Sequence, residues 1–244
     1  MKVVSVKEMQ ALDRKTIQDF GLPGLVLMER ASLGVVEVIE KEYPDILNSS
    51  QKAIIAVGTG NNGGDGLAIA RLLFTKGKLV NIILIGDDSK RSDDNKLQLE
   101  LLRKLGIQEF TYSEDVFSTL SDSADIIIDA IFGVGLTREL SGDYITLVSL
   151  INSSECVKLA VDLPSGLDGD TGKILGIAVM ADTTVTFAFP KTGLLMDQAL
   201  DYVGNLKVVD IGIPTIYESE IKTNYVTADF IKNIFPASRK KSSF

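Results

Sequence analysis

Runs of consecutive apolar residues alternate with helical patterns through most of the chain. The apolar runs are short and rich in β-branched residues, and they fall at residues 53–57, 79–85, 124–131, 157–163, 181–189 and 206–211. Helical patterns lie between these runs, at residues 65–76 and 91–105. Strands that are apolar at consecutive positions are buried on both faces, as in a parallel sheet covered by helices. The pattern therefore predicts an α/β fold of three α/β/α layers, with a mostly parallel, doubly wound sheet.

The first forty residues follow a different pattern, which predicts two N-terminal helices. Ser5 and Glu8 have the spacing of a capping box, and apolar residues recur after them at near-helical intervals. The Gly-Leu-Pro-Gly sequence at residues 21–24 breaks this helix. Residues 25–43 form the second predicted helix, which ends before Pro44. We expect both helices to pack on the main domain.

Length and charge limit the kind of protein this can be. The 244 residues have a mass of 26.4 kDa, and we expect one domain at residues 1–235 followed by a linker-like tail at 236–244. The formal net charge of −8 argues against a nucleic-acid partner, because phosphate binding needs clustered Lys and Arg. No apolar run approaches the roughly 20 residues of a membrane span, and no signal-peptide pattern is present. We therefore expect a cytoplasmic protein.

Two residue types are almost missing. The chain has no histidine, which excludes Ser-His-Asp hydrolysis, His-ligated zinc and a His general base. Its one cysteine, Cys156, can form neither an internal disulfide nor a thiolate metal cage, so a reducing compartment is compatible with the sequence.

The densest chemical signal is a Gly/Asn-rich stretch at residues 58–66, between a predicted strand and a predicted helix. Such a stretch turns tightly and directs backbone N–H groups inwards, which suits a pyrophosphate at a helix N-terminus. Its first six residues match G-x-G-x-x-G, the dinucleotide fingerprint, and Asp87 could then bind the ribose. The alternative is a plain turn in which Asp65 caps the following helix.

Three further polar groups lie within predicted strands or at their ends. Asp129 lies near the carboxyl end of one strand, and Asp162 lies within another that Pro164 ends. Burial of Asp162 would raise its pKa towards values useful in acid–base chemistry. Lys191 closes the next strand. Each of these residues has a structural alternative. Asp129 could bind loop amides, Asp162 could belong to a turn, and Lys191 could be solvated. If the sheet is parallel, all of these groups converge on one crevice with the Gly/Asn-rich stretch.

These motifs together resemble the NAD(P)H-hydrate epimerase family, also called the YjeF N-terminal-like domain. The resemblance runs from about Val4 to Ile213. It rests on five sequences: Leu-Met-Glu-Arg-Ala at 27–31, Gly-Asn-Asn-Gly-Gly-Asp-Gly at 60–66, Asp-Ala-Ile-Phe-Gly at 129–133, Val-Asp-Leu-Pro-Ser-Gly at 161–166 and Phe-Pro-Lys at 189–191. It implies a Rossmann-like fold and interconversion of the R and S hydrates of NADH and NADPH.

The resemblance also implies roles for individual residues. Asp162 would be the general acid/base and would contact the substrate, and Lys191 would orient water or tune Asp162. A potassium ion would bind Asn62, Asp129 and Ser165, whose oxygen donors suit a hard ion. The remaining substrate-binding residues would be Asn61, Asn62, Gly63, Gly64, Asp65, Gly133, Val134, Gly135, Leu136, Thr137, Arg138 and Glu139.

Several alternatives remain open at this stage. The hydroxyl could be expelled by the ring nitrogen, or the ring could open and close again. The chain could instead be a non-catalytic nucleotide- or protein-binding module of the same fold, or an NAD(P)-dependent oxidoreductase. The family suggests a homodimer, and residues 235–244 resemble the junction to an NAD(P)H-hydrate dehydratase, which could be a fused or a separate partner. The preference between the two hydrates is not predicted.

Overall fold

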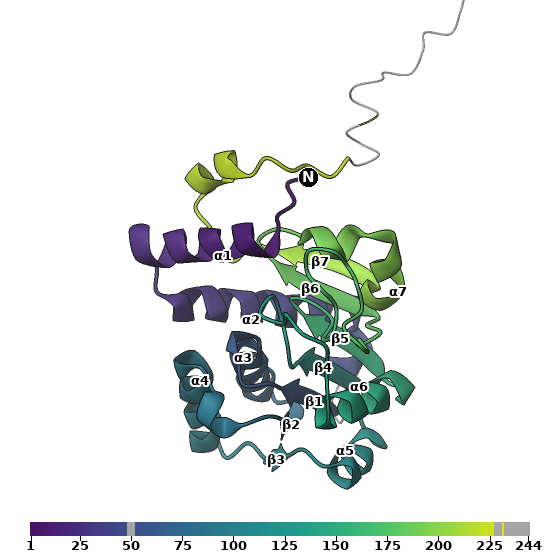
Figure 1. Cartoon of the computed structure of the whole chain (residues 1–244). Coiled ribbons are helices and arrows are strands. Elements are labelled where there is room, and N and C mark those ends of the chain that lie inside the picture. The colour runs from purple at the N-terminus through teal and green to yellow at the C-terminus, as the bar shows by residue number, and fades with distance from the viewer. Residues whose placement is uncertain (48–51, 227–230, 232–244) are drawn as a thin grey trace, which may run out of the picture.

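Seven parallel strands form one sheet in the part of the chain that this computed structural model describes, residues 1–47, 52–226 and 231 (Figure 1). Their order across the sheet is β3-β2-β1-β4-β5-β6-β7. The chain thus builds outwards from β1 to β3 and then returns to the other side of β1, which confirms the doubly wound topology. The strands are β1 (Lys52–Val57), β2 (Leu79–Leu84), β3 (Glu109–Thr111), β4 (Ile126–Ala130), β5 (Val157–Val161), β6 (Thr183–Phe187) and β7 (Asn205–Val209).

Helices cover both faces of this sheet, which confirms the three layers (Figure 1). Because successive strand residues point to opposite faces, Ile55 and Val57 pack with the α1–α4 layer, whereas Ile54 and Ala56 pack with α5 and α6. The helices are α1 (Val6–Arg14), α2 (Gly24–Glu42), α3 (Asn61–Thr75), α4 (Asp93–Lys104), α5 (Glu114–Ser121), α6 (Asp143–Ser153) and α7 (Leu200–Val203).

Both predicted N-terminal helices are present. The Ser5 side chain accepts a hydrogen bond from the Glu8 backbone N–H, and the Glu8 carboxylate accepts one from the Ser5 N–H, so the capping box is confirmed. A π-helical turn, Lys15–Asp19, continues α1. The break before α2 falls where Gly and Pro predict it.

The structure differs from the predicted elements in three places. Helix α3 begins at Asn61, four residues before the predicted start, because low helix propensity in Gly and Asn hides its first turn. Strand β5 ends at Val161, so Asp162 follows the strand and does not lie within it. The short elements β3, α5, α6 and α7 had no predicted counterpart. The predicted tail at 236–244 lies outside the described residues.

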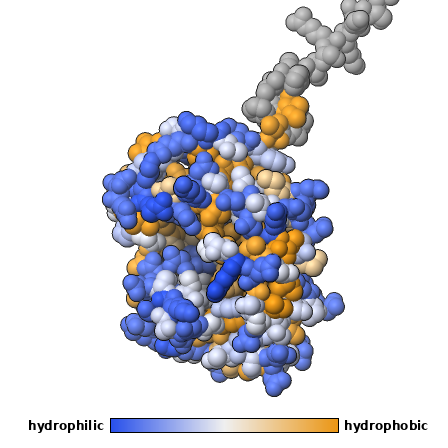
Figure 2. All heavy atoms as spheres, in the orientation of Figure 1, coloured by the Kyte–Doolittle hydropathy of each residue, from blue (hydrophilic) through white to orange (hydrophobic). Residues whose placement is uncertain are grey.

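The surface is mixed in character. Figure 2 shows hydrophilic residues over much of the face seen in Figure 1, with hydrophobic residues exposed between them. No helix in the described ranges is both long and apolar enough to cross a membrane.

Candidate active site

The carboxyl ends of β1 and β4 meet where the strand order reverses. The Gly58 N–H donates a hydrogen bond to the Ala130 carbonyl at 3.1 Å. A Cβ atom at Gly58 would lie 2.0 Å from the Ile131 carbonyl oxygen, so only glycine allows the two chain segments to come this close. Open α/β sheets bind their ligands at such a reversal, outside the carboxyl ends of the strands.

The Gly/Asn-rich stretch forms the first turn of α3 at this point. Gly60 is the N-cap residue, so the interpretation of Asp65 as a helix cap is wrong. A Cβ atom at Gly63 would lie 2.0 Å from the Gly58 carbonyl oxygen, which again requires glycine. The first N–H groups of a helix lack partners within the helix, and together with its dipole they attract anions. The geometry thus offers an anion site at residues 61–63, since the Gly64 N–H already donates to the Gly60 carbonyl.

Two buried side chains hold the preceding turn in place. The Asn95 amide donates to the carbonyl oxygens of Gly58 at 3.0 Å and Gly60 at 2.9 Å. The Arg91 guanidinium donates to the Asn95 side-chain oxygen at 3.0 Å and also pairs with Asp88. Sequence analysis missed both residues, because they lie in and just before α4, far along the chain from the turn that they support.

Asp162 and Lys191 form a buried ion pair. The Lys191 Nζ atom lies 2.6 Å from Asp162 Oδ1, and Lys191 is only 1% exposed. Lys191 also donates to the Thr186 hydroxyl at 3.1 Å and the Phe187 carbonyl at 3.2 Å. The alternative of a solvated lysine is therefore wrong. Asp162 is not an isolated desolvated acid, because a fixed ammonium group compensates its charge.

The backbone around this pair is unusual. Among the described residues, Asp162 and Ala188 are the two non-glycine residues with positive φ, 66° and 58°. Such conformations cost free energy and concentrate at functional sites. Val4 donates to the Pro190 carbonyl and accepts from the Thr192 N–H, so the start of the chain lies directly beside Lys191.

Asn62 and Asp162 meet at Gly133. A Cβ atom at Gly133 would lie 3.1 Å from Asn62 Oδ1 and 3.2 Å from Asp162 Oδ2. Residues from three separate strand ends thus share one small volume, as the predicted convergence requires. Both polar atoms of the Asn62 amide are buried without a hydrogen-bond partner in the described part of the chain. Orphaned buried amides are costly, which indicates that a ligand completes this position.

Asp129 and Ser165 form a second buried pair close to this point. The Ser165 hydroxyl donates to Asp129 at 2.6 Å, and the backbone N–H groups of Ser165 and Ile131 donate to the same carboxylate. Burial raises the pKa of Asp129 to about 6, and these hydrogen bonds oppose the rise. Asp129 therefore binds loop amides, as its structural alternative predicted, and also offers an oxygen donor.

The loop at residues 133–139 runs from Gly133 to the surface. Phe132, just before it, stacks at a tilt on Tyr144 with ring centroids 4.9 Å apart. Gly133, Val134 and Leu136 are half-buried, whereas the exposed members are Gly135, Thr137, Arg138 and Glu139. The predicted ligand-binding loop thus begins beside Asp162 and ends in solvent.

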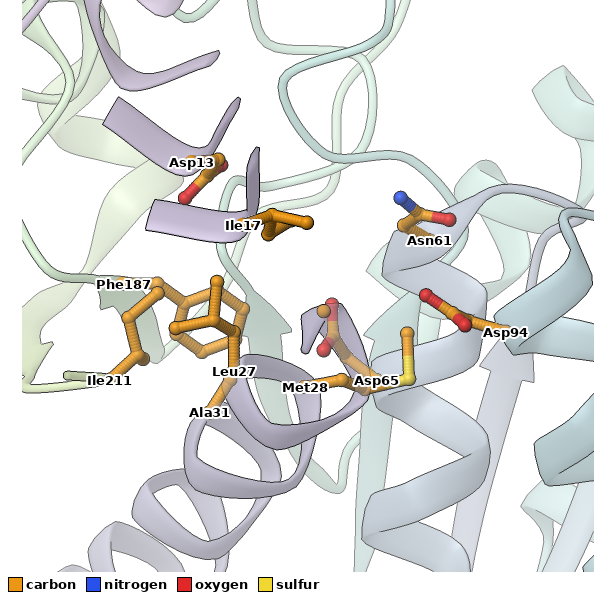
Figure 3. A pocket seen from close by; sticks show the side chains of 11 residues that line it. Asp13, Ile17, Leu27, Met28, Ala31, Asn61, Asp65, Asp94, Phe187 and Ile211 are labelled. Atoms are coloured by element: carbon orange, nitrogen blue, oxygen red, sulfur yellow. The ribbon is translucent and has the colours of Figure 1, made fainter. Parts of the chain in front are cut away.

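A cavity of about 170 Å³ opens between the N-terminal helices and the carboxyl edge of the sheet (Figure 3). Its polar lining comes from Asp13 on α1, Asn61 and Asp65 on α3, and Asp94 on α4. The rest of the lining is Ile17, Gly24, Leu27, Met28, Ala31, Phe187 and Ile211.

The acids of this cavity have shifted pKa values. Burial raises the pKa of Asp13 to about 6; Lys191 lowers it and Asp162 raises it. Burial also raises the pKa of Asp65 well above its ordinary value, with further contributions from Asp162 and Asp13. These mutual effects connect the cavity to the Asp162–Lys191 pair. Sequence analysis missed Asp13, because it belongs to no motif and lies on a helix that was expected only to pack.

Asp87 is committed to its own loop. Its carboxylate accepts hydrogen bonds from the Ser89 N–H at 3.0 Å and the Ser89 hydroxyl at 2.7 Å, and so caps a short 3₁₀ turn. These contacts, led by the Ser89 hydroxyl, lower the pKa of Asp87. This capping role is the simplest account of Asp87, in place of a ribose contact.

Fold and site together define an α/β protein of the kind that binds nucleotides where a parallel sheet reverses its strand order. The family of this chain follows from sequence comparison. Residues 24–193 match the family described as YjeF-related protein N-terminus, and the chain belongs to this family.

Its relatives cover almost the same length. The chain is 42% identical over 209 residues to an NAD(P)H-hydrate epimerase of Limosilactobacillus fermentum, covering 86% of this chain and 96% of the relative. An NAD(P)H-hydrate epimerase of Oenococcus oeni is 39% identical over 211 residues, with the same coverage. The crystal structure of yeast ynu0 shares the fold with a TM-score of 0.78 at 22% identity, covering 94% of this chain and 98% of that one.

Proposed function

We propose that this chain is an NAD(P)H-hydrate epimerase, an isomerase that interconverts the R and S hydrates of NADH and NADPH. Relatives with this name match 86% of the chain at about 40% identity. The observation that carries the proposal is the meeting of Asn62 and Asp162 at Gly133, with Lys191 buried against Asp162. An acid–base group thus lies beside an anion-binding helix end, as a reaction on a nucleotide requires.

The substrate's phosphates and ribose are assigned to the first turn of α3. Asn61, Asn62 and Gly63 offer backbone N–H groups there. The Gly64 N–H donates to the Gly60 carbonyl at 3.1 Å, so Gly64 would contact the ligand in another way, and Asp65 follows within the same helix. The loop from Gly133 to Glu139 would cover the same ligand from the opposite strand end, with its exposed half nearest to solvent.

A potassium ion fits the polar groups beside this site. The side-chain oxygens of Asn62, Asp129 and Ser165 are hard donors, and the Asn62 amide is buried without a partner. Among the described residues, no group of three His, Cys, Asp or Glu side chains is placed to hold a metal ion. The donors here are one carboxylate and neutral oxygens, which suit a singly charged hard ion. When bound, the ion would reduce repulsion between the anionic substrate and the carboxylates.

The proposed reaction moves a hydroxyl between the two faces of a ring. The hydrate carries its hydroxyl on the carbon beside the ring nitrogen, whose lone pair can expel it as the C–O bond breaks. Asp162 exchanges the proton of the departing and returning water, and Lys191 holds the carboxylate in place. Ring opening and closure is the competing route. Reaction in ¹⁸O-labelled water separates them, because expulsion introduces solvent oxygen and ring opening retains the original one.

The direct test follows both hydrates by chromatography, with and without potassium, after subtraction of the uncatalysed interconversion. Asp162→Asn is expected to lower kcat/KM by about 10²–10⁴-fold, because a positioned acid–base group contributes that much, while circular dichroism stays unchanged. Asp19→Asn is the matched control, since Asp19 is exposed in the same helical region as the cavity wall. A wild-type rate in Asp162→Asn contradicts the role given to Asp162.

The same assay separates the competing functions. Hydrate binding without interconversion favours a binding module, and oxidation of NADH with a carbonyl substrate favours an oxidoreductase. The homodimer and an NAD(P)H-hydrate dehydratase partner stay predictions, which light scattering and co-purification test. Cytoplasmic location also stays a prediction.

A further inference from the structure

The turn that precedes α3 is supported by one short segment, residues 91–95, at the start of α4. The Asn95 amide donates hydrogen bonds to the Gly58 carbonyl at 3.0 Å and to the Gly60 carbonyl at 2.9 Å. The Ser92 N–H donates to the carbonyl of the intervening residue at 2.9 Å. All three carbonyl oxygens of the turn are thus bound by this segment.

This arrangement fixes the direction of the peptide dipoles in the turn. A carbonyl oxygen carries partial negative charge, so one that faced the end of α3 would repel a phosphate. Asn95 draws two of these oxygens towards α4, whereas the N–H groups of residues 61–63 belong to the helix end and lack partners within the helix. A Cβ atom at Gly63 would lie 2.7 Å from the Asn95 side-chain nitrogen, so the amide also packs directly against the first turn of α3.

Arg91 sets the orientation of the Asn95 amide. Its guanidinium donates to the Asn95 side-chain oxygen at 3.0 Å, so the amide nitrogen is the atom that faces the two carbonyl groups. The guanidinium also lies 3.4 Å from the Gly58 carbonyl oxygen.

Arg91 also places a positive charge behind the turn. Its side chain is buried, whereas 74% of the side chain of its ion-pair partner, Asp88, is exposed. A buried charge is screened much less than an exposed one. In a protein with a formal net charge of −8, this guanidinium favours an anion at the turn.

Given the proposed epimerase function, we propose that Asn95 is a positioning residue for the pyrophosphate of the substrate and that Arg91 holds it in its donating orientation. Both side chains act through the turn and not on the reacting ring. The pair therefore sets the affinity for the dinucleotide and leaves proton transfer at Asp162 unchanged.

The test measures the binding of ADP-ribose, which carries the pyrophosphate but no nicotinamide ring, by isothermal titration calorimetry. Asn95→Leu keeps the shape of the side chain and removes both hydrogen bonds to the turn. Its Kd is expected to rise about 10- to 100-fold, because two carbonyl groups lose their buried donor and the turn shifts.

Asn152→Leu is the matched control. The Asn152 amide also joins two backbone groups, the Ala178 carbonyl at 2.9 Å and the Met180 N–H at 2.8 Å, but it lies on α6, away from the turn. Its Kd for ADP-ribose is expected to match that of the wild type. An equal rise in both variants indicates a general loss of structure and overturns the role given to Asn95.

Kinetics with the hydrate of NADH give a second readout. Asn95→Leu is expected to raise KM by about 10- to 100-fold and to change kcat by less than about twofold, because binding is lost equally from the ground state and the transition state. A fall in kcat with unchanged KM contradicts a role in binding the pyrophosphate.

Arg91→Met tests the second residue, and it decides if Asn95→Leu does not fold. Because Asp88 is largely exposed, this change leaves no buried carboxylate behind. Kd for ADP-ribose is expected to rise about tenfold, the worth of one hydrogen bond from a charged group. An unchanged Kd overturns the role given to Arg91 and, where Asn95→Leu does not fold, the whole proposal.

These outcomes separate the positioning role from the proposed function. A wild-type protein that binds ADP-ribose but does not interconvert the hydrates overturns the epimerase proposal alone. An active wild type whose affinity for ADP-ribose is unchanged in Asn95→Leu overturns the positioning role alone, as does an active wild type that does not bind ADP-ribose.

Discussion

Two walls of the candidate site hold their polar groups in different ways. The sheet wall is formed by the carboxyl ends of the strands, where Asp162, Lys191, Asp129 and Ser165 are buried and hydrogen-bonded in pairs without lining the cavity itself. On the helical wall, Asp13 is half-buried, and burial together with nearby charges sets its pKa. The sheet wall follows strand ends that the sequence marks with motifs. The helical wall is placed by contacts between distant parts of the chain, and no motif marks it.

This difference shows which polar groups of the site stabilise the fold and which destabilise it. Ion pairs and hydrogen bonds compensate the charges of the sheet wall, so removing one partner leaves a buried charge behind. Burying the charge of Asp13 on the helical wall costs free energy, so removing that charge should increase the free energy of unfolding. Substitutions on the two walls are therefore expected to change the free energy of unfolding in opposite directions.

The largest effect is expected for Lys191→Met. This change keeps much of the side-chain volume but leaves Asp162 buried without its counter-charge. The free energy of unfolding should fall by about 3–5 kcal/mol, measured by urea denaturation, and epimerase activity should fall with it. Lys173→Met, at an exposed lysine, should change stability by under about 0.5 kcal/mol. Recovery of stability on adding Asp162→Asn would confirm the cause, and a loss below about 1 kcal/mol would contradict the ion pair.

A smaller effect of opposite sign is expected for Asp13→Asn. The pKa of Asp13 is about 6 in the folded protein, against an ordinary value of 3.8. The wild-type fold therefore binds the proton more tightly than the unfolded chain, and stability is lost as pH rises from about 4 through 6. The variant avoids this loss. It should be about 1–2 kcal/mol more stable than wild type at pH 8, after allowance for solvent screening, and nearly equal at pH 4. Equal stability at both pH values would contradict the desolvated state of Asp13.

The smallest effect is expected for Ser5→Ala, which removes the N-cap of α1. Loss of such a cap costs about 1 kcal/mol. Ser113→Ala removes the corresponding cap of α5 on the other face of the sheet and should cost about the same. KM for the hydrate should rise in Ser5→Ala alone, because α1 lines the cavity and α5 does not. An equal KM in both variants would show that the helical wall does not contact the substrate.

The sequence predicted the sheet wall well and the helical wall poorly. Buried parallel strands appear as unbroken apolar runs, so six of the seven strands and the convergence of Asp129 and Asp162 could be predicted. The missing strand, β3, has only three residues. The first turn of α3 was hidden because its close approach to Gly58 demands glycines, which resemble a loop in sequence.

Contacts between side chains far apart in sequence could not be predicted in this way. Asn95 supports a turn that precedes it by 35 residues or more, and no local pattern encodes that distance. The helix that carries Asp13 follows Val4, which hydrogen-bonds to Pro190 and Thr192 far along the chain. Such placement depends on tertiary packing, which periodicity does not report.

The hydrogen bonds between Val4 and the chain around Lys191 also set an order of events during synthesis. Val4 leaves the ribosome well before Pro190 and Thr192, so these hydrogen bonds can form only after the later residues have been made. Closing so long a loop carries an entropic cost that is offset only when the central strands have already assembled. The segment around Val4 is accordingly expected to dock beside Lys191 at the end of folding and not at its start.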